Sequence, residues 1–297
     1  MRFVIAGSSG FLGTALRDHL AREGHEVFRL VRAETVSPHE STWDPYAGNV
    51  DQDLIDRADV VVSLSGAPIA HWPWTDAYKK TLLASRVAPT RTLAEAVAAS
   101  PSPPAFLAQS GSDGYGNRGD EVLTEDSPTR VESTLGQVAR EWEAAVRPAT
   151  DAGARVCVMR TAVVLHRSGG ALKPMLPPFR LGLGAKLGDG RQYFPTISLH
   201  DWVRAVTFLA TENSCSGIYN LTGPAPTTNA EFTKELGRML NRPTLFGVPS
   251  LPIRTVLGEL ANQLLGSVRA EPARLLEAGF TFEHPTLNRR LAAALSS

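Results

Sequence analysis

Cysteine is scarce in this chain, and its charges cancel. Cys157 and Cys215 are the only cysteines, too few for a four-ligand zinc site or a disulfide framework. Both lie in apolar runs, so we expect buried free thiols. Lys plus Arg and Asp plus Glu number 30 each, which gives a formal net charge of zero. Nothing in this balance indicates nucleic acid or an anionic membrane as a partner.

Long apolar segments and clustered metal ligands are missing as well. No apolar stretch reaches the roughly 20 residues that span a bilayer, and there is no internal repeat or low-complexity segment. The histidines are scattered, so we predict no metal site. Residues 1–6 predict the first strand of the fold, which leaves no room for a signal peptide. With 43% apolar and 20% charged residues, the chain is typical of a globular protein, and we expect a cytoplasmic one.

A glycine-rich turn stands near the start of the chain. Residues 7–13 read Gly-Ser-Ser-Gly-Phe-Leu-Gly, follow an apolar run and open a helix predicted over 11–23. This order of strand, turn and helix is the context of a dinucleotide-binding motif. Gly7 permits a tight turn, Gly10 leaves space for a pyrophosphate at the helix N-terminus, and Gly13 lets helix and strand pack closely. The alternative is a glycine turn without a ligand.

The end of the second predicted strand distinguishes between two cofactors. This strand is expected over 26–31 and is followed by Arg32, with Arg29 nearby and no acid before Glu34. An acid at this place binds the ribose 2′-hydroxyl of NAD, whereas a guanidinium can hold the 2′-phosphate of NADP. The sequence therefore predicts NADP; the alternative is that Arg32 is a solvated surface arginine.

Alternating strands and helices predict the α/β class, with a Rossmann-like doubly wound parallel sheet. Further strands are expected at 59–64, 105–109, 155–160 and 218–221, and residues 35–53 are predicted to be loop. Helices are expected over 74–99 with a kink or break at Pro89, and over 133–147, 229–240, 252–265, 272–278 and 286–295. Asp201 is expected to cap a helix that ends near 211.

A change of composition near residue 165 predicts two domains. Residues 1–165 would form the NADP-binding domain, to which a strand and helix near 195–221 return. Residues 166–297 would form a smaller C-terminal α/β substrate lobe. Glycine and proline crowd residues 169–190, which is typical of a ligand-facing loop, although an irregular connector has the same composition.

Several segments resemble the extended short-chain dehydrogenase/reductase superfamily. Within it, the chain is similar to the atypical branch of epimerase family proteins, which belong to the NAD-dependent epimerase/dehydratase family and carry a C-terminal domain of unknown function. The matching segments are residues 6–13, 64–69, 84–90, 118–128, 175–184 and 264–285. The resemblance implies a nicotinamide dinucleotide, NADP, lined by Gly7, Gly10, Phe11, Leu12, Gly13, Arg32, Ser63, Leu64 and Arg86.

The catalytic pair of that superfamily is absent. Its reductive chemistry normally uses Tyr-x-x-x-Lys, in which the lysine lowers the pKa of a tyrosine that acts as acid and base. None of the five tyrosines has a lysine four residues later, and no lysine lies between Lys80 and Lys173. The candidate proton donors that remain are Tyr115, Ser110, Ser112 and Tyr193, and we predict Tyr115 and Ser110 as the catalytic residues.

Two classes of function are compatible with this loss. The first is an NADP-dependent oxidoreductase or nucleotide-sugar epimerase-like enzyme that acts on a small molecule through another proton donor; the segment 169–190 favours it. The second is a non-catalytic NADP(H)-binding sensor or partner-docking protein, because an unassisted tyrosine with a pKa of about 10 is a poor base at neutral pH. The sequence names neither the substrate nor the oligomeric state, for which a homodimer is one candidate.

Overall fold

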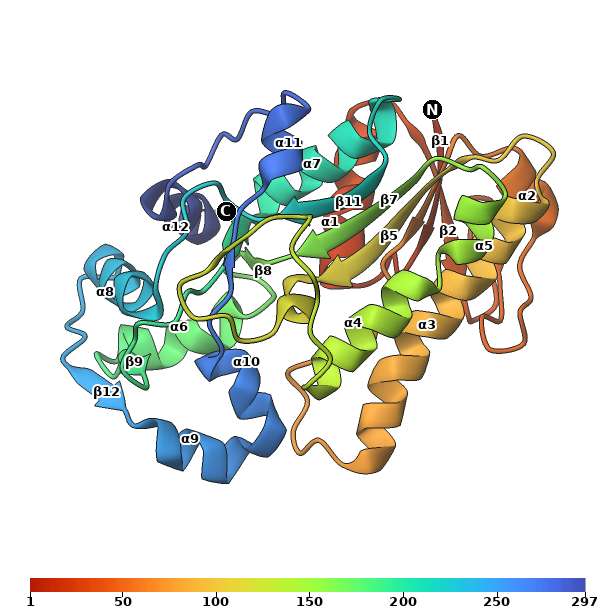
Figure 1. The fold of residues 1–297 in the computed structure, drawn as a ribbon. Helices are drawn as coiled ribbons and strands as arrows, with labels where there is room; N and C mark the ends of the chain where they lie inside the picture. Colours follow the sequence, from red (N-terminus) through yellow and green to blue (C-terminus); the bar gives the residue numbers. More distant parts are fainter. Residues whose placement is uncertain (297) are drawn as a thin grey trace.

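A seven-stranded parallel sheet forms the centre of the computed structural model, which describes residues 1–296 (Figure 1). The strand order is β11-β7-β5-β4-β1-β2-β3. The strands are β1 (Arg2–Ala6), β2 (Glu26–Val31), β3 (Glu40–Thr42), β4 (Val60–Ser63), β5 (Ala105–Gly111), β7 (Val156–Thr161) and β11 (Gly217–Leu221). The predicted Rossmann-like α/β fold is confirmed.

Helices cover both faces of this sheet, because its central strands are apolar on both sides. Phe3 and Ile5 of β1 face a core shared with Trp202, whereas Val4 faces a second core with Leu93. The first face carries α1 (Phe11–Arg22), α7 (Leu199–Thr211) and α11 (Ala273–Glu277). The second carries α2 (Gln52–Asp56), α3 (Asp76–Ala99) and α5 (Arg147–Asp151), with α4 (Thr134–Ala144) packed against α3.

The C-terminal elements gather beside the carboxyl ends of the strands, at the left of Figure 1. Here α6 (Leu172–Arg180), α8 (Asn229–Met239) and α12 (Leu287–Ser296) share a core. Short parallel pairs are β8 (Val163–Leu165) with β10 (Thr196–Ser198), β9 (Ala185–Leu187) with β12 (Phe246–Val248), and β6 (Val122–Leu123) with β13 (Arg269–Ala270). This side is completed by an arm that consists of α9 (Ser250–Leu257), η2 (Gly258–Leu260) and α10 (Ala261–Leu265). The short helix η1 (Ser112–Tyr115) directly follows β5.

Four local predictions are wrong in whole or in part. Residues 35–53 are not all loop, because β3 adds an edge strand to β2 and α2 begins at Gln52. No break occurs at Pro89, since α3 is continuous from Asp76 to Ala99; the alternative, a kink at Pro89, stays a prediction. The helix predicted over 252–265 is divided at Gly258, whose φ of +55° interrupts a helix. Most of the proline-rich segment 169–190 is ordered as α6 and β9.

Asp201 is not the cap of α7. Ser198 is the N-cap, and its hydroxyl accepts a hydrogen bond from the backbone N–H of Asp201. The buried Asp201 carboxylate instead accepts from the backbone N–H groups of Glu283 and His284, at 3.0 and 2.8 Å. This side chain therefore holds the C-terminal segment against α7.

Both cysteines are buried free thiols, as the sequence predicts. Within residues 1–296, no helix combines the length and the apolar character that crossing a bilayer requires. The division of the chain into domains at residue 165 stays a prediction, although β11 and α7, which come after that point, belong to the central sheet and its first face.

Candidate functional site

The glycine turn after β1 has no space for side chains at two of its glycines. A Cβ at Gly7 would lie 2.7 Å from the carbonyl carbon of Leu64, and one at Gly13 would overlap the carbonyl oxygen of Gly7. Gly10 is exposed and is the N-cap of α1, with no side-chain cap and no acid in the first turn. Because the first N–H groups of a helix lack partners and carry positive partial charge, this turn fits a pyrophosphate.

The segment after β8 lies against this turn. Phe11 contacts Gly169 and Gly170, and a Cβ at Gly169 would overlap the Phe11 ring. The His166 ring lies 6.1 Å from that of Phe11, measured between centroids. The sequence predicts a ligand-facing loop over 169–190, but only its first glycines are placed beside the turn by these contacts.

Arg32 is the free guanidinium next to the turn. Leu30 of β2 pairs with Ala6 of β1, so the residues after β2 emerge beside those after β1. Arg32 is exposed, and within residues 1–296 its side chain has neither a hydrogen bond nor an ion pair. Arg29, in contrast, pairs with Glu40 on β3. Arg32 is therefore the arginine available to a ligand here.

Ser63, predicted to line the cofactor site, has a side chain that is closed off from solvent. Its side chain is fully buried, and its hydroxyl lies 3.0 Å from that of Thr90, which also accepts a hydrogen bond from Trp142. Leu64 is half-buried, and its backbone lies against Gly7.

Arg86 of α3 is a buried charge that contacts the loop after β4. Its guanidinium donates to the carbonyl oxygens of Leu82 and Ala67, each at 3.0 Å, and lies 5.2 Å from the Trp142 ring. Burial lowers the pKa of Arg86, and the negative charge of Asp113 opposes that shift. Arg86 thus shapes the loop after β4 and directs positive charge towards η1.

Tyr115 and Ser110, the predicted catalytic residues, are buried and hydrogen-bonded within the protein. The Tyr115 hydroxyl is fully buried and lies 2.8 Å from Asn220 Oδ1 and 2.9 Å from the Thr124 carbonyl oxygen. Burial also raises the pKa of Tyr115, so that even less of its basic phenolate form is present at neutral pH. Ser110 is 1% exposed and donates to Glu143 at 2.9 Å. Neither side chain reaches open space.

Both residues belong to a buried network centred on Arg160. The Arg160 guanidinium donates two hydrogen bonds of 2.8 Å to Glu143 and lies 4.8 Å from the Tyr115 ring. Burial disfavours the charge of Arg160, but the hydrogen bonds and charge of Glu143 outweigh it and raise the pKa of Arg160. The network joins β5, β7 and α4 beneath the site.

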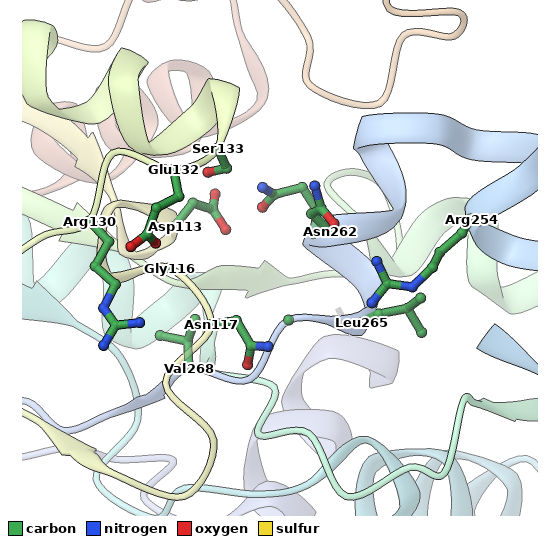
Figure 2. Close-up of a pocket in the computed structure, with 12 residues that line it drawn as sticks. Asp113, Gly116, Asn117, Arg130, Glu132, Ser133, Arg254, Asn262, Leu265 and Val268 are labelled. Carbon is green, nitrogen blue, oxygen red and sulfur yellow. The ribbon is translucent and has the colours of Figure 1, made fainter. Parts of the chain in front are cut away.

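A cavity of about 220 Å³ opens beyond the carboxyl end of β5 (Figure 2). One wall comes from η1, the loop after it and the start of α4, and the opposite wall comes from the arm α9–α10. Figure 2 shows the side chain of Asp113 on the first wall and that of Arg254 on the second. The polar lining residues are Asp113, Asn117, Arg130, Glu132, Ser133, Arg254, Asn262 and Gln263. Tyr115, a predicted catalytic residue, does not line it, and neither does the predicted ligand-facing loop at 169–190.

The arm α9–α10 is held across the cavity by side-chain contacts. Glu259 pairs with Lys79 of α3 and accepts a hydrogen bond from Thr134 of α4. Trp72 donates from its indole nitrogen to the carbonyl oxygen of Val256 at 3.3 Å. These contacts link the arm to the sheet-bearing part of the molecule.

Asp113 is the cavity residue that sequence reasoning missed. It follows β5 by two residues and is half-buried, and no side-chain hydrogen bond to its carboxylate occurs within residues 1–296. Burial raises the pKa of Asp113 to about 6, although the charge of Arg86 opposes the shift. Its position directly after a predicted strand could have indicated a binding role, because ligand-binding side chains gather just past the carboxyl ends of parallel strands.

This pKa implies a stability effect. Since the folded pKa lies above the usual 3.8, ionised Asp113 destabilises the fold above about pH 6, and the penalty vanishes below about pH 4. We therefore expect Asp113→Asn to raise the free energy of unfolding by about 1–2 kcal/mol above pH 6, after discounting for partial exposure. Urea unfolding at several pH values measures this; destabilisation at every pH would instead indicate a structural role.

The parallel sheet, the glycine turn after β1 and a cavity at the same edge define a dinucleotide-binding Rossmann-type protein. The chain belongs to the NAD dependent epimerase/dehydratase family, whose model matches residues 3–222. A second model, Domain of unknown function (DUF1731), matches residues 248–294, which include the arm α9–α10. The resemblance seen in the sequence is confirmed.

Relatives match along nearly the whole chain. "Epimerase family protein Mb2239" of Mycobacterium bovis is 44% identical over 98% of this chain and 96% of its own length. The crystal structure of human epimerase family protein SDR39U1 with NADPH has a TM-score of 0.91 and 34% identity, covering 100% of this chain and 99% of that one. A Corynebacterium glutamicum structure described as a nucleoside-diphosphate sugar epimerase has a TM-score of 0.79 and 36% identity; it covers 99% of this chain and 58% of that one.

Proposed function

We propose that this chain is an NADPH-dependent oxidoreductase that acts on a small polar molecule in the Asp113–Arg254 cavity. The observation that carries this proposal is that the glycine turn and the cavity lie at the same edge of the sheet. β1 and β5 run in the same direction, with β4 paired to both, and each ends at one of the two features. A cofactor in the turn and a substrate in the cavity would then share that edge.

The cofactor is assigned to residues whose local structure suits its parts. Gly7, Gly10 and Gly13 leave the N-terminus of α1 open to the pyrophosphate, and Arg32 would hold the 2′-phosphate. The NADPH in the crystal structure of the human relative supports the choice of nicotinamide cofactor. When bound, this cofactor supplies or accepts a hydride.

The cavity suggests the kind of substrate. Its volume of about 220 Å³ lies below the roughly 300–1,000 Å³ of typical ligand pockets, which favours a compound near the size of a monosaccharide. The amides of Asn117, Asn262 and Gln263 suit hydroxyl groups, and the exposed Arg254 suits an anionic group. We therefore infer a hydroxylated carbonyl compound or the corresponding alcohol, with or without a phosphate.

A non-catalytic NADP(H) sensor is the second candidate. The burial of Tyr115 and Ser110 favours it, because neither residue is open to a substrate. Both candidate functions require NADPH binding, but only the oxidoreductase would also turn over a substrate. A cytoplasmic location and a homodimer stay predictions.

Arg32 provides the test of cofactor choice. Charge-assisted hydrogen bonds are worth about 1.5–3 kcal/mol, so we expect Arg32→Asp to weaken NADPH binding about 10- to 100-fold and to leave NADH binding nearly unchanged. Fluorescence titration of both nucleotides measures this. Arg289→Asp, an equal charge change at an exposed arginine of α12, is the control. Equal loss of NADPH affinity in both variants, or none in either, would exclude Arg32 as the 2′-phosphate ligand.

A further inference from the structure

We propose that Asp113 is the catalytic acid and base of this site, a role that rests on the proposed function. It would donate a proton to the substrate oxygen when a carbonyl is reduced, and it would remove that proton when an alcohol is oxidised. The superfamily uses a tyrosine supported by a lysine for this task, and this chain has no such pair. Asp113 would replace the pair from a different element, η1.

The position of Asp113 fits proton transfer. It lines the cavity from the wall that continues β5, opposite the arm that carries Arg254 (Figure 2). Arg86, which influences Asp113 electrostatically, contacts Gly66 in the loop after β4. Since β4 pairs with β1, whose turn is assigned to the cofactor, Asp113 would lie on the side of the cavity that faces the cofactor, where the reacting end of a substrate would be placed.

The carboxylate is also free to react. The end of β5 does not crowd the carboxyl group of Asp113. Even a Cβ added at Gly111 would lie 3.6 Å from Asp113 Oδ2, which is an ordinary contact distance. No side-chain hydrogen bond occupies that carboxylate within the described chain. A structural carboxylate in a half-buried position normally accepts several hydrogen bonds, as Asp201 does here.

The charged groups around Asp113 set its proton affinity. Arg86 of α3 favours the ionised form, while burial favours the protonated form and raises the pKa of Asp113 to about 6. Glu132 and Arg130 before α4, and Arg254 of α9, are the other charged residues of the cavity. A general acid and base works best when its pKa lies near the working pH. At pH 7 a group with this pKa is about one-tenth protonated, so both forms are available.

The other polar residues of this wall are less suited to the role. The Ser133 hydroxyl caps α4 by accepting from the backbone N–H of Gly136 at 3.0 Å. Glu132 is exposed to solvent, so nothing shields its proton from bulk water. Asp113 is the acidic side chain in this cavity that is partly withdrawn from solvent.

The reduction balances with the groups named. NADPH gives a hydride to the carbonyl carbon and becomes NADP⁺. Asp113 gives its proton to the carbonyl oxygen, so that C=O becomes CH–OH and the carboxyl becomes a carboxylate. Water then returns a proton to Asp113. The reverse sequence oxidises an alcohol.

The test compares wild type with Asp113→Asn and Asp113→Ser, using NADPH oxidation with glyceraldehyde, dihydroxyacetone, butane-2,3-dione and pyruvate as probes. We expect the rate with the best probe to fall about 100- to 10,000-fold in both variants, while the NADPH Kd and the far-ultraviolet circular dichroism stay unchanged. Asp120→Asn, at an exposed acid outside the cavity, should keep the wild-type rate. Wild-type kcat/KM for reduction should fall tenfold per pH unit above about pH 6, and the residual rate of the variants should lack this dependence.

A second measurement does not need turnover. NMR of protein labelled with ¹³C at the aspartate carboxyl carbons should show one resonance that titrates near pH 6, absent from Asp113→Asn and present in Asp120→Asn. Turnover retained by both Asp113 variants would overturn the role of Asp113 while leaving the oxidoreductase intact. Wild-type protein that binds NADPH but oxidises it with none of the probes would instead overturn the oxidoreductase function, and the role of Asp113 with it.

Discussion

Glu143→Ala is expected to lower the free energy of unfolding by about 3–5 kcal/mol, because it leaves the Arg160 guanidinium buried without its partner. The Arg160 side chain is 5% exposed and that of Glu143 is 15% exposed, so water cannot replace the lost carboxylate. Ser110 also loses its acceptor. For a chain of this size we expect the Tm to fall by about 6–20 °C, which calorimetry measures.

The double variant Glu143→Leu with Arg160→Met is the control for this effect. It removes both charges and fills the space with apolar groups, so we expect it to be more stable than Glu143→Ala alone. A double variant less stable than the single one would show that the pair is stabilising in itself, rather than merely costly to break. NADPH affinity should change little in either variant that folds, since neither residue lies at the glycine turn.

Gly13→Ala is expected to weaken NADPH binding by at least about 100-fold, which corresponds to about 2.8 kcal/mol. The added methyl group would overlap the carbonyl oxygen of Gly7 and approach the Cα of Ser8 to 2.7 Å. The turn and α1 would have to separate, and the N–H groups that face the pyrophosphate would move with them. NADPH titration, with circular dichroism to monitor folding, measures the effect.

Gly24→Ala is the matched control for the glycine turn. Gly24 ends α1 at a positive φ of 79°, and a Cβ there meets nothing within 4 Å. The variant should lose about 1 kcal/mol of stability through backbone strain and keep its NADPH affinity. If the two glycine variants lost affinity equally, general destabilisation of α1 would explain the result better than a displaced cofactor turn.

The sheet and the glycine turn could be predicted because their causes are local. Apolar runs such as 60–63 mark strands buried on both faces, and Gly13 is required by close packing that the motif itself encodes. The errors lie where tertiary context decides. The three residues of β3 are stabilised by pairing with β2, and nothing in a segment so short distinguishes an edge strand from loop.

In the candidate site, too, features with a local cause could be predicted, whereas features that depend on tertiary contacts could not. Arg32 could be proposed as a cofactor ligand because a single strand end carries the signal, and that role stays a prediction. The burial of Tyr115 and Ser110 could not be predicted locally, because it depends on Asn220 and Glu143, which are distant in sequence. The far wall of the cavity belongs to α9–α10, about 140 residues beyond Asp113, so no local pattern could show that these segments face each other.

A crystal structure of this protein grown with NADPH tests the central claim most directly. The account predicts a pyrophosphate against residues 7–13, the 2′-phosphate at Arg32 and the nicotinamide directed towards Asp113. A glycine turn that holds no nucleotide, or a nicotinamide whose C4 is screened from the Asp113 carboxyl group, would contradict it.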